Sequence, residues 1–389
     1  MGWSLHRPAG VSTHNRAMSF KGYTLLTPGS GEVCLIDMDG RVCHNWRFPE
    51  WHAQYAAFAD DGRLLVRGGP PRDPSKPFRQ GAESDPLMTI EERCTLLPSN
   101  YQQLREVDWA GEVLWEHHDP LMHHDFFKTP RDTFLVTRNV LMDKAASDRV
   151  RGWKKARKTD HPMVTDEIQE VDRDHNVLWS VRLDEVLDPV LDPIGILERR
   201  IEWTHTNSIC ESPDGRKILF SCKNINRVGL IDKATRSLDW RFGHPVTNGQ
   251  HHARFLPNGN IHMFDNGTRK PGLPASRVIE VEPTSQKVVW EYQANPPFSF
   301  FSPIVSSADR LANGNTLICE GISGRIFEVT RKGETVWEWN NPFTATVRDG
   351  QLSTQLWRAH RYSPDHPAFA GQDLDPGRHK AMNRMYGLA

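Results

Sequence analysis

Histidines recur at five places where a polar stretch leads into a short apolar run. They are His52, the pair His123-His124, His205, the pair His251-His252, and His360. Neutral imidazoles from different parts of a chain can hold a divalent metal ion. Alternatively, one imidazole can act as a nucleophile while its neighbours donate hydrogen bonds to an oxyanion. Imidazoles that only fill a polar channel and bridge buried waters are the structural alternative.

A repeat of strand-like segments must position these histidines. Each copy alternates apolar and polar residues, passes through a turn with Asp or Gly, and ends in a run that carries a tryptophan. The six copies end at Trp46, Trp115, Trp179, Trp240, Trp290 and Trp337. Period-2 alternation around a short turn predicts a β-hairpin, and six spaced copies predict radial repetition.

A second hairpin pattern lies between successive copies of the first. Residues 252–260 and 307–315 each pass from a short strand into an Asn-Gly turn, which favours the positive φ angles of tight hairpins. Two hairpins make the four strands of one propeller blade. Residues 22–26 lack a first strand and residues 355–362 lack a partner after them, so we expect these segments to pair. The sequence therefore predicts an all-β fold, a single six-bladed β-propeller over residues 1–389 whose C-terminal strand pairs with the N-terminal blade.

In a propeller the first strand of each blade lines the channel, so the histidines are expected to gather near one mouth.

Two insertions and a tail lie outside this scheme. Residues 67–103 are rich in Pro, Arg and Asp, and residues 143–165 include the basic run 154–158. We expect the basic loop to be a solvated excursion or a lid for an anionic substrate, and residues 365–389 to extend over the surface.

The composition limits the classes of partner that this protein is expected to bind. The 48 Lys and Arg residues nearly cancel the 49 Asp and Glu residues, so no global field favours nucleic acid or an anionic membrane. The N-terminus lacks a basic segment leading into an apolar run, and no stretch approaches a membrane span, so we expect a cytoplasmic protein. The six cysteines form no CxxC pair and are expected to be reduced packing residues. Nothing in the sequence indicates the oligomeric state.

Four short segments have a distinctive composition. Residues 203–209 read Trp-Thr-His-Thr-Asn-Ser-Ile, and residues 250–253 read Gln-His-His-Ala. Residues 263–267 read Met-Phe-Asp-Asn-Gly, and residues 300–304 read Phe-Phe-Ser-Pro-Ile. Together they resemble segments of the bacterial arylsulfate sulfotransferase superfamily, whose members use no nucleotide donor. The resemblance is densest between residues 200 and 340.

This resemblance implies a six-bladed propeller and ping-pong transfer of a sulfuryl group between phenolic compounds, without a metal ion. By motif position, His251 would be the transiently sulfated histidine. His205 and Asn207 would contact the sulfuryl or phenolic oxygens, and His124 would be a further donor. The family carries an Arg clamp on the next strand, where this chain has Lys223, with Arg227 the nearest alternative. Lysine is a point charge and cannot form the bidentate fork of an arginine.

The expected site thus has catalytic and substrate-binding members. The expected catalytic residues are His251, His205, His124 and Lys223. The expected substrate-binding residues are Asn207, His252, Arg358, His360, His52 and Arg227. Arg358 could instead form a salt bridge that holds the circle of blades closed. The expected partner is a small aromatic substrate such as a sulfate ester, with no cofactor.

Two other functions stay open on the residues alone. A lyase, hydrolase or oxygenase could use His52, His124, His205 and His251 as ligands of a divalent metal. The sequence shows no close Asp/Glu cluster on these strands, which disfavours a hard metal ion. A non-catalytic propeller that serves as a binding platform is the third possibility.

Overall fold

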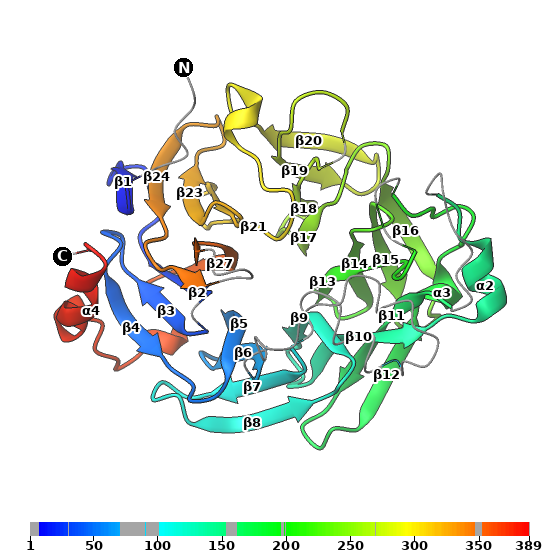
Figure 1. Cartoon of the computed structure of the whole chain (residues 1–389), viewed down its shortest axis with the longest axis horizontal. Helices are drawn as coiled ribbons and strands as arrows, with labels where there is room; N and C mark the ends of the chain where they lie inside the picture. Colours follow the sequence, from blue (N-terminus) through cyan, green and yellow to red (C-terminus); the bar gives the residue numbers. More distant parts are fainter. Residues whose placement is uncertain are drawn as a thin grey trace. The chain divides into compact units, whose positions relative to one another are not determined.

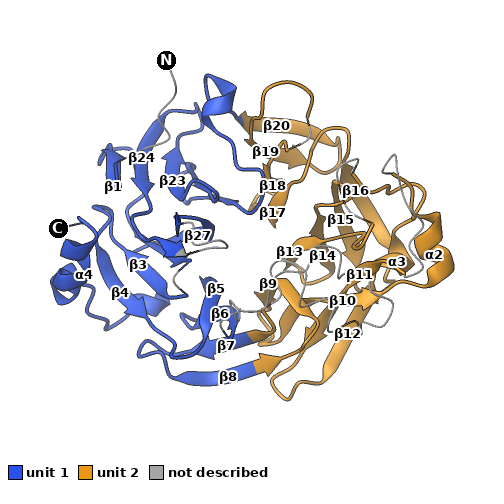
Figure 2. Ribbon diagram, in the orientation of Figure 1, with its two compact units in different colours: residues 1–72, 104–116, 292–389 blue, residues 73–103, 117–291 orange. Residues whose placement is uncertain are grey.

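The computed structural model describes residues 8–29, 31–70, 90, 101–152, 162–195, 198, 200–268, 270–346 and 352–388. The chain divides into two compact units (Figure 2). Unit 1 contains residues 1–72, 104–116 and 292–389, and unit 2 contains residues 73–103 and 117–291. Most of the insertion at 67–103 and the basic run 154–158 lie outside the described residues.

Unit 1 holds three antiparallel sheets and a small ribbon. The first has the order β27 (Leu356–Tyr362), β2 (Tyr23–Pro28), β3 (Val33–Ile36), β4 (Val42–Trp46). The second, whose ends extend past the unit boundary, consists of β5 (His52–Phe58), β6 (Leu64–Gly69), β7 (Gln103–Val107), β8 (Val113–His118). The third has the order β1 (Gly10–His14), β24 (Thr335–Asn340), β23 (Arg325–Val329), β22 (Thr316–Glu320), β21 (Ser307–Arg310). The ribbon pairs β25 (Ala345–Thr346) with β26 (Leu352–Ser353), and the short helices are η2 (Pro297–Ser299), η4 (Pro367–Phe369), η5 (Pro376–His379), α4 (Lys380–Met385).

Unit 2 holds three four-stranded sheets in simple chain order. The first contains β9 (Met122–Lys128), β10 (Phe134–Leu141), β11 (Val164–Val171), β12 (Val177–Arg182). The second contains β13 (Thr206–Glu211), β14 (Lys217–Cys222), β15 (Arg227–Asp232), β16 (Leu238–Gly243). The third contains β17 (His251–Phe255), β18 (Ile261–Asp265), β19 (Arg277–Glu282), β20 (Lys287–Tyr292). Two helices, α2 (Lys144–Arg149) and α3 (Leu183–Val186), lie in the connections of the first and second sheets (Figure 1).

These sheets confirm the predicted all-β fold, a six-bladed β-propeller with four-stranded blades. Every repeat tryptophan lies on the fourth strand of its sheet. The predicted closure is also confirmed, because β27 pairs with β2 in unit 1, with Tyr23 opposite Tyr362 and Leu25 opposite His360. The expectation that residues 1–389 form one domain stays a prediction.

The turn between β3 and β4 shows how the repeat builds its hairpins. Asp37 Oδ1 accepts hydrogen bonds from the backbone N–H groups of Asp39 and Arg41, 2.9 Å each. Gly40 has a φ of +79°, and a Cβ there would lie 2.7 Å from Cδ1 of Trp339. Glycine is therefore required both by the backbone conformation and by the close packing.

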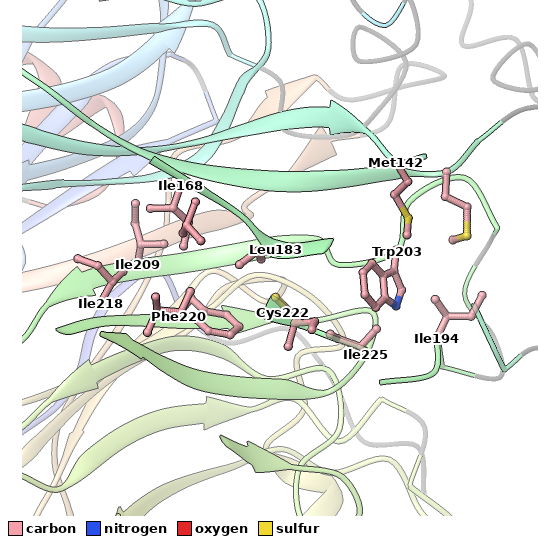
Figure 3. Packing of buried hydrophobic residues seen from close by; sticks show 14 of the residues in the cluster. Met142, Ile168, Leu183, Ile194, Trp203, Ile209, Ile218, Phe220, Cys222 and Ile225 are labelled. Carbon is pink, nitrogen blue, oxygen red and sulfur yellow. The ribbon is translucent and has the colours of Figure 1, made fainter. Parts of the chain in front are cut away.

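The core of unit 2 supports the segment that carries His205. Ile168, Ile209 and Phe220 pack together between neighbouring sheets (Figure 3). Trp203 is fully buried in the same cluster, and its indole N–H donates to the carbonyl of Asp192 at 2.8 Å. This anchor fixes the chain two residues before His205.

The ends of the chain show features that the sequence did not predict. The strand β1 adds a fifth strand to the outer edge of β24. The C-terminal segment does more than cover the surface, because Phe369 and Leu388 are buried and Asn383 hydrogen-bonds both backbone groups of Val42. In the part of the chain that the structure describes, no helix has the length and apolarity needed to cross a bilayer. The five described cysteines are free and buried, and Cys94 lies outside the described residues.

Candidate active site

A backbone irregularity places a histidine at the start of each first strand in unit 2. His124, His205 and His252 have φ angles of 49°, 57° and 54°. The pairing of β9 with β10, of β13 with β14 and of β17 with β18 shifts register at or directly beside each of these residues. A left-handed backbone is uncommon for residues other than glycine, and bulges beside functional sites often re-aim side chains. The same irregularity in three successive sheets re-aims one histidine side chain in each of them.

His251 is held as a neutral imidazole with one ring nitrogen fixed. Its Nδ1 lies 2.9 Å from the carbonyl oxygen of Gly249 and 2.7 Å from Oδ1 of Asn266. A carbonyl oxygen can only accept, so Nδ1 carries the proton and the lone pair is at Nε2. Burial lowers the pKa of His251 to about 3, and the nearby charges of Lys223 and His205 act in the same direction. At neutral pH the ring therefore offers an unprotonated Nε2.

His205 is paired with a carboxylate. Its Nδ1 lies 2.6 Å from Oε2 of Glu202, and both side chains are about nine-tenths buried, with 12% and 9% exposed. An ionised carboxylate accepts a hydrogen bond from Nδ1–H, which fixes the tautomer, and its charge offsets that of the ring whenever the ring carries a second proton. The ring also packs edge-on against His124, with centroids 4.3 Å apart. His205 therefore links His124 to the surroundings of His251.

His124 contacts a buried pair of side chains, His123 and Asp166. Nε2 of His123 lies 3.2 Å from Oδ1 of Asp166, and its Nδ1 lies 2.7 Å from Nδ1 of His124. Burial raises the pKa of Asp166, but His123 and the hydrogen bonds from Thr206 and Thr204 outweigh it, so the pKa falls below its ordinary value. The ionised carboxylate thus lies against His123, which in turn contacts the ring of His124.

The other predicted residues of unit 2 make different contacts. Lys223 is close enough to His251 for its charge to lower the pKa of that ring, and its Nζ lies 2.9 Å from Oε1 of Glu198. Arg227 instead places Nε and Nη2 each 2.7 Å from Oδ1 of the buried Asp192. Asn207 donates to the carbonyl of Gln250 at 2.8 Å. His252 follows His251 directly and is fully buried.

Three predicted residues lie in unit 1. Nε2 of His360 lies 3.1 Å from Oη of Tyr55, and the guanidinium carbon of Arg358 lies 4.6 Å from the centre of the Tyr55 ring. His52 begins β5, where its ring packs against Gly31. Arg358 and His360 thus share a neighbour, Tyr55, that the sequence did not indicate.

The structure corrects the expectation that acidic groups are absent around the histidines. Glu202 contacts His205, Asp166 contacts His123, and in unit 1 Asp309 contacts His360. Glu202 precedes His205 by three residues and could have been noticed from that spacing. Asp166 lies on β11, and its partner lies two strands along in the same sheet, so only the fold brings the two together.

This arrangement supports two kinds of chemistry. An unprotonated Nε2 beside a lysine and a carboxylate-bound imidazole suits nucleophilic attack on an anionic group, with an acid–base group at hand. A histidine whose other nitrogen is hydrogen-bonded to a carbonyl or carboxylate can equally ligate a metal ion through Nε2, which applies to His205 and His251. The geometry alone therefore leaves both chemistries open.

Comparison with known proteins identifies the family of this chain. The family model described as Arylsulfotransferase (ASST) matches residues 94–342. An arylsulfate sulfotransferase, AssT, of Escherichia coli O6:H1 is 26% identical over 331 aligned positions, which cover 62% of this chain and 53% of the relative. The chain thus spans about half the length of this curated relative.

A solved structure supports the fold independently. A protein of unknown function from Bacteroides caccae superposes with a TM-score of 0.53 at 14% identity, over 88% of this chain and 98% of that one. This likeness concerns the fold alone. The family match covers well over half of the sequence and includes β9, β13 and β17, the strands that carry the histidines of unit 2. The chain belongs to the arylsulfotransferase family.

Proposed function

We propose that this protein transfers a sulfuryl group from an aryl sulfate to a phenol through a transient sulfate on Nε2 of His251. The observation that carries the proposal is the state of His251, which is buried and fixed at Nδ1 by Gly249 and Asn266. Its low pKa leaves Nε2 unprotonated. Family membership supports the reaction class, and the unprotonated ring nitrogen supports the choice of nucleophile.

In the first half-reaction the Nε2 lone pair attacks the sulfur of the donor. The N–S bond forms as the S–O bond to the aryl group breaks, and the bonding electrons leave on the phenolic oxygen. The protonated His205 gives its Nε2 proton to that oxygen, and Glu202 at 2.6 Å stabilises the protonated ring beforehand.

In the second half-reaction an acceptor phenol takes the place of the product. His205 removes the phenolic proton, the phenolic oxygen attacks the sulfur, and the N–S bond breaks to restore the neutral His251. Sulfuryl transfer has a loose, anionic transition state, so positioning and fixed donors supply most of the rate enhancement. We assign the contacts with the sulfuryl oxygens to Lys223 and Asn207, and the reaction as proposed uses no resident metal ion.

The direct test is detection of the sulfated enzyme. The purified chain is mixed with 4-nitrophenyl sulfate without an acceptor, and intact mass is measured at mildly alkaline pH, followed by peptide mapping. We expect the mass of one SO3 on the peptide that carries His251, with release of an equal amount of 4-nitrophenol. The same chain unfolded in urea is the control. An absent adduct together with absent phenol release contradicts the proposal.

The role of Glu202 predicts a dependence on the leaving group. Glu202→Gln keeps the shape but removes the charge that stabilises protonated His205. We expect the rate with phenyl sulfate, a poor leaving group, to fall about 10²-fold, and the rate with 4-nitrophenyl sulfate to change by less than about threefold. Steady-state kinetics with both donors measures this, with Glu185→Gln at an exposed position as the control. Equal slowing of both donors would show that Glu202 is merely structural.

A further inference from the structure

Unit 1 contains a second hydrogen-bonded series of an acid, an imidazole and a hydroxyl. Oδ2 of Asp309 lies 2.7 Å from Nδ1 of His360, and Nε2 of the same ring lies 3.1 Å from Oη of Tyr55. The three residues come from the first strands β21, β27 and β5. An acid–imidazole–hydroxyl series is the arrangement in which a base activates a nucleophile and a third group orients the base.

The direction of the hydrogen bonds follows from the carboxylate. Ionised Asp309 can only accept, so Nδ1 of His360 carries the proton and Nε2 accepts from the Tyr55 hydroxyl. The Arg358 guanidinium lies over the Tyr55 ring, 4.6 Å from its centre. A cation at this place favours the anionic form of the phenol when its proton leaves.

The surrounding strands hold this geometry in place. The Thr27 hydroxyl donates to the carbonyl of Gln54, next to Tyr55, at 2.8 Å. The backbone N–H of Phe58 donates to the hydroxyl of Tyr362 at 2.9 Å, which ties β5 to β27. Tyr55 is 3% exposed, whereas the side chains of His360 and Asp309 are 12% and 24% exposed. The phenol is thus rigidly held, and solvent reaches the group through its base and acid.

We propose that Tyr55, His360 and Asp309 form a reactive triad in which the Tyr55 oxygen attacks sulfur(VI) electrophiles. In the reaction the Tyr55 O–S bond forms, the bond from sulfur to its leaving group breaks, and the phenolic proton passes to Nε2 of His360. Tyr55 and His360 are the catalytic residues, and Asp309 is a positioning residue that stabilises the resulting imidazolium. The choice of sulfur as the electrophile rests on the proposed function, while the nucleophile rests on the triad alone.

Methanesulfonyl fluoride is a suitable probe because it is small and carries a sulfur(VI) centre with a fluoride leaving group. The folded chain is treated briefly, and tryptic peptides are quantified by mass spectrometry. Tyr386 is the internal comparison, because it is more exposed than Tyr55 and exposure alone would make it react faster. We expect Tyr55 to be labelled at least about tenfold faster than Tyr386.

Two variants distinguish activation of Tyr55 by the triad from simple exposure of its hydroxyl to the reagent. Asp309→Asn retains the size of the side chain but no longer stabilises the imidazolium, and we expect the labelling of Tyr55 to fall at least about tenfold while that of Tyr386 stays unchanged. Tyr55→Phe removes only the hydroxyl and should abolish the signal, and thermal melting confirms that each variant is folded. Labelling of Tyr55 no faster than Tyr386, or unchanged in a folded Asp309→Asn chain, overturns the proposal. Because the readout uses neither His251 nor phenol turnover, it can fail or succeed independently of the proposed sulfuryl transfer.

Discussion

Replacing His251 by asparagine is expected to lower the turnover of aryl sulfates by about 10³-fold or more, because no other atom can take the place of Nε2 as the nucleophile. Asparagine suits the test because its amide N–H can still donate to Gly249 or Asn266, which now accept from Nδ1. The buried acceptors therefore keep a partner, and the loss reports on chemistry. The measurement is steady-state release of 4-nitrophenol in the presence of a phenolic acceptor.

His118→Asn is the matched control, because His118 is exposed at the end of β8. It should retain the full rate. Both variants should melt at nearly the same temperature as the parent chain. A folded His251→Asn chain that keeps more than about a tenth of the rate would assign the nucleophile to another residue.

Replacing Glu328 by alanine is expected to destabilise the fold by about 3–5 kcal/mol, because it leaves a buried positive charge without its partner. Glu328 and Arg361 are both inaccessible to solvent, and Oε2 lies 2.6 Å from Nη1. Burial lowers the pKa of Arg361 to about 10, although Glu328 opposes this, so the guanidinium remains charged at neutral pH. The pair joins β23 to the closing strand β27, and the midpoint of urea unfolding measures its loss.

Two further variants give this experiment its controls. Asp373→Ala breaks an ion pair with Arg378 in which both side chains are more than half exposed, and it should change stability by less than about 1 kcal/mol. The double replacement Glu328→Leu with Arg361→Met removes both charges, so we expect most of the lost stability to return. A single Glu328→Ala variant within about 1 kcal/mol of the parent would show that the pair does not hold the closing strand.

The blades could be predicted because one residue type marks each of them. Tryptophans such as Trp46 and Trp240 end regular hairpins, and their positions on the fourth strands follow from alternation and turn chemistry alone. The strand β1 could not be predicted in this way. It pairs with β24, more than 300 positions along the chain, and the sequence of residues 10–14 carries no signal that names its partner.

The places of the histidines along the chain could be predicted, whereas the partners that reach them through strand pairing could not. His124, His205 and His251 were expected from their places at the starts of first strands, and the structure puts them there in unit 2. Asn266 lies in a segment that the resemblance had already singled out, but its contact with His251 requires the pairing of β17 and β18. Asp309 occupies a first strand that lacks a histidine, so comparing the six first strands position by position would have found it.

The two ends of the chain cover the outer strands of two blades in unit 1. The strand β1 pairs with the free edge of β24, and Asn383 of α4 satisfies both backbone groups of Val42 on the outermost strand β4. An uncovered edge strand is a template for another molecule's strand. Copies that are clipped by a protease after Asn15 and lose β1 would expose the edge of β24, and such clipped copies could pair with one another through it.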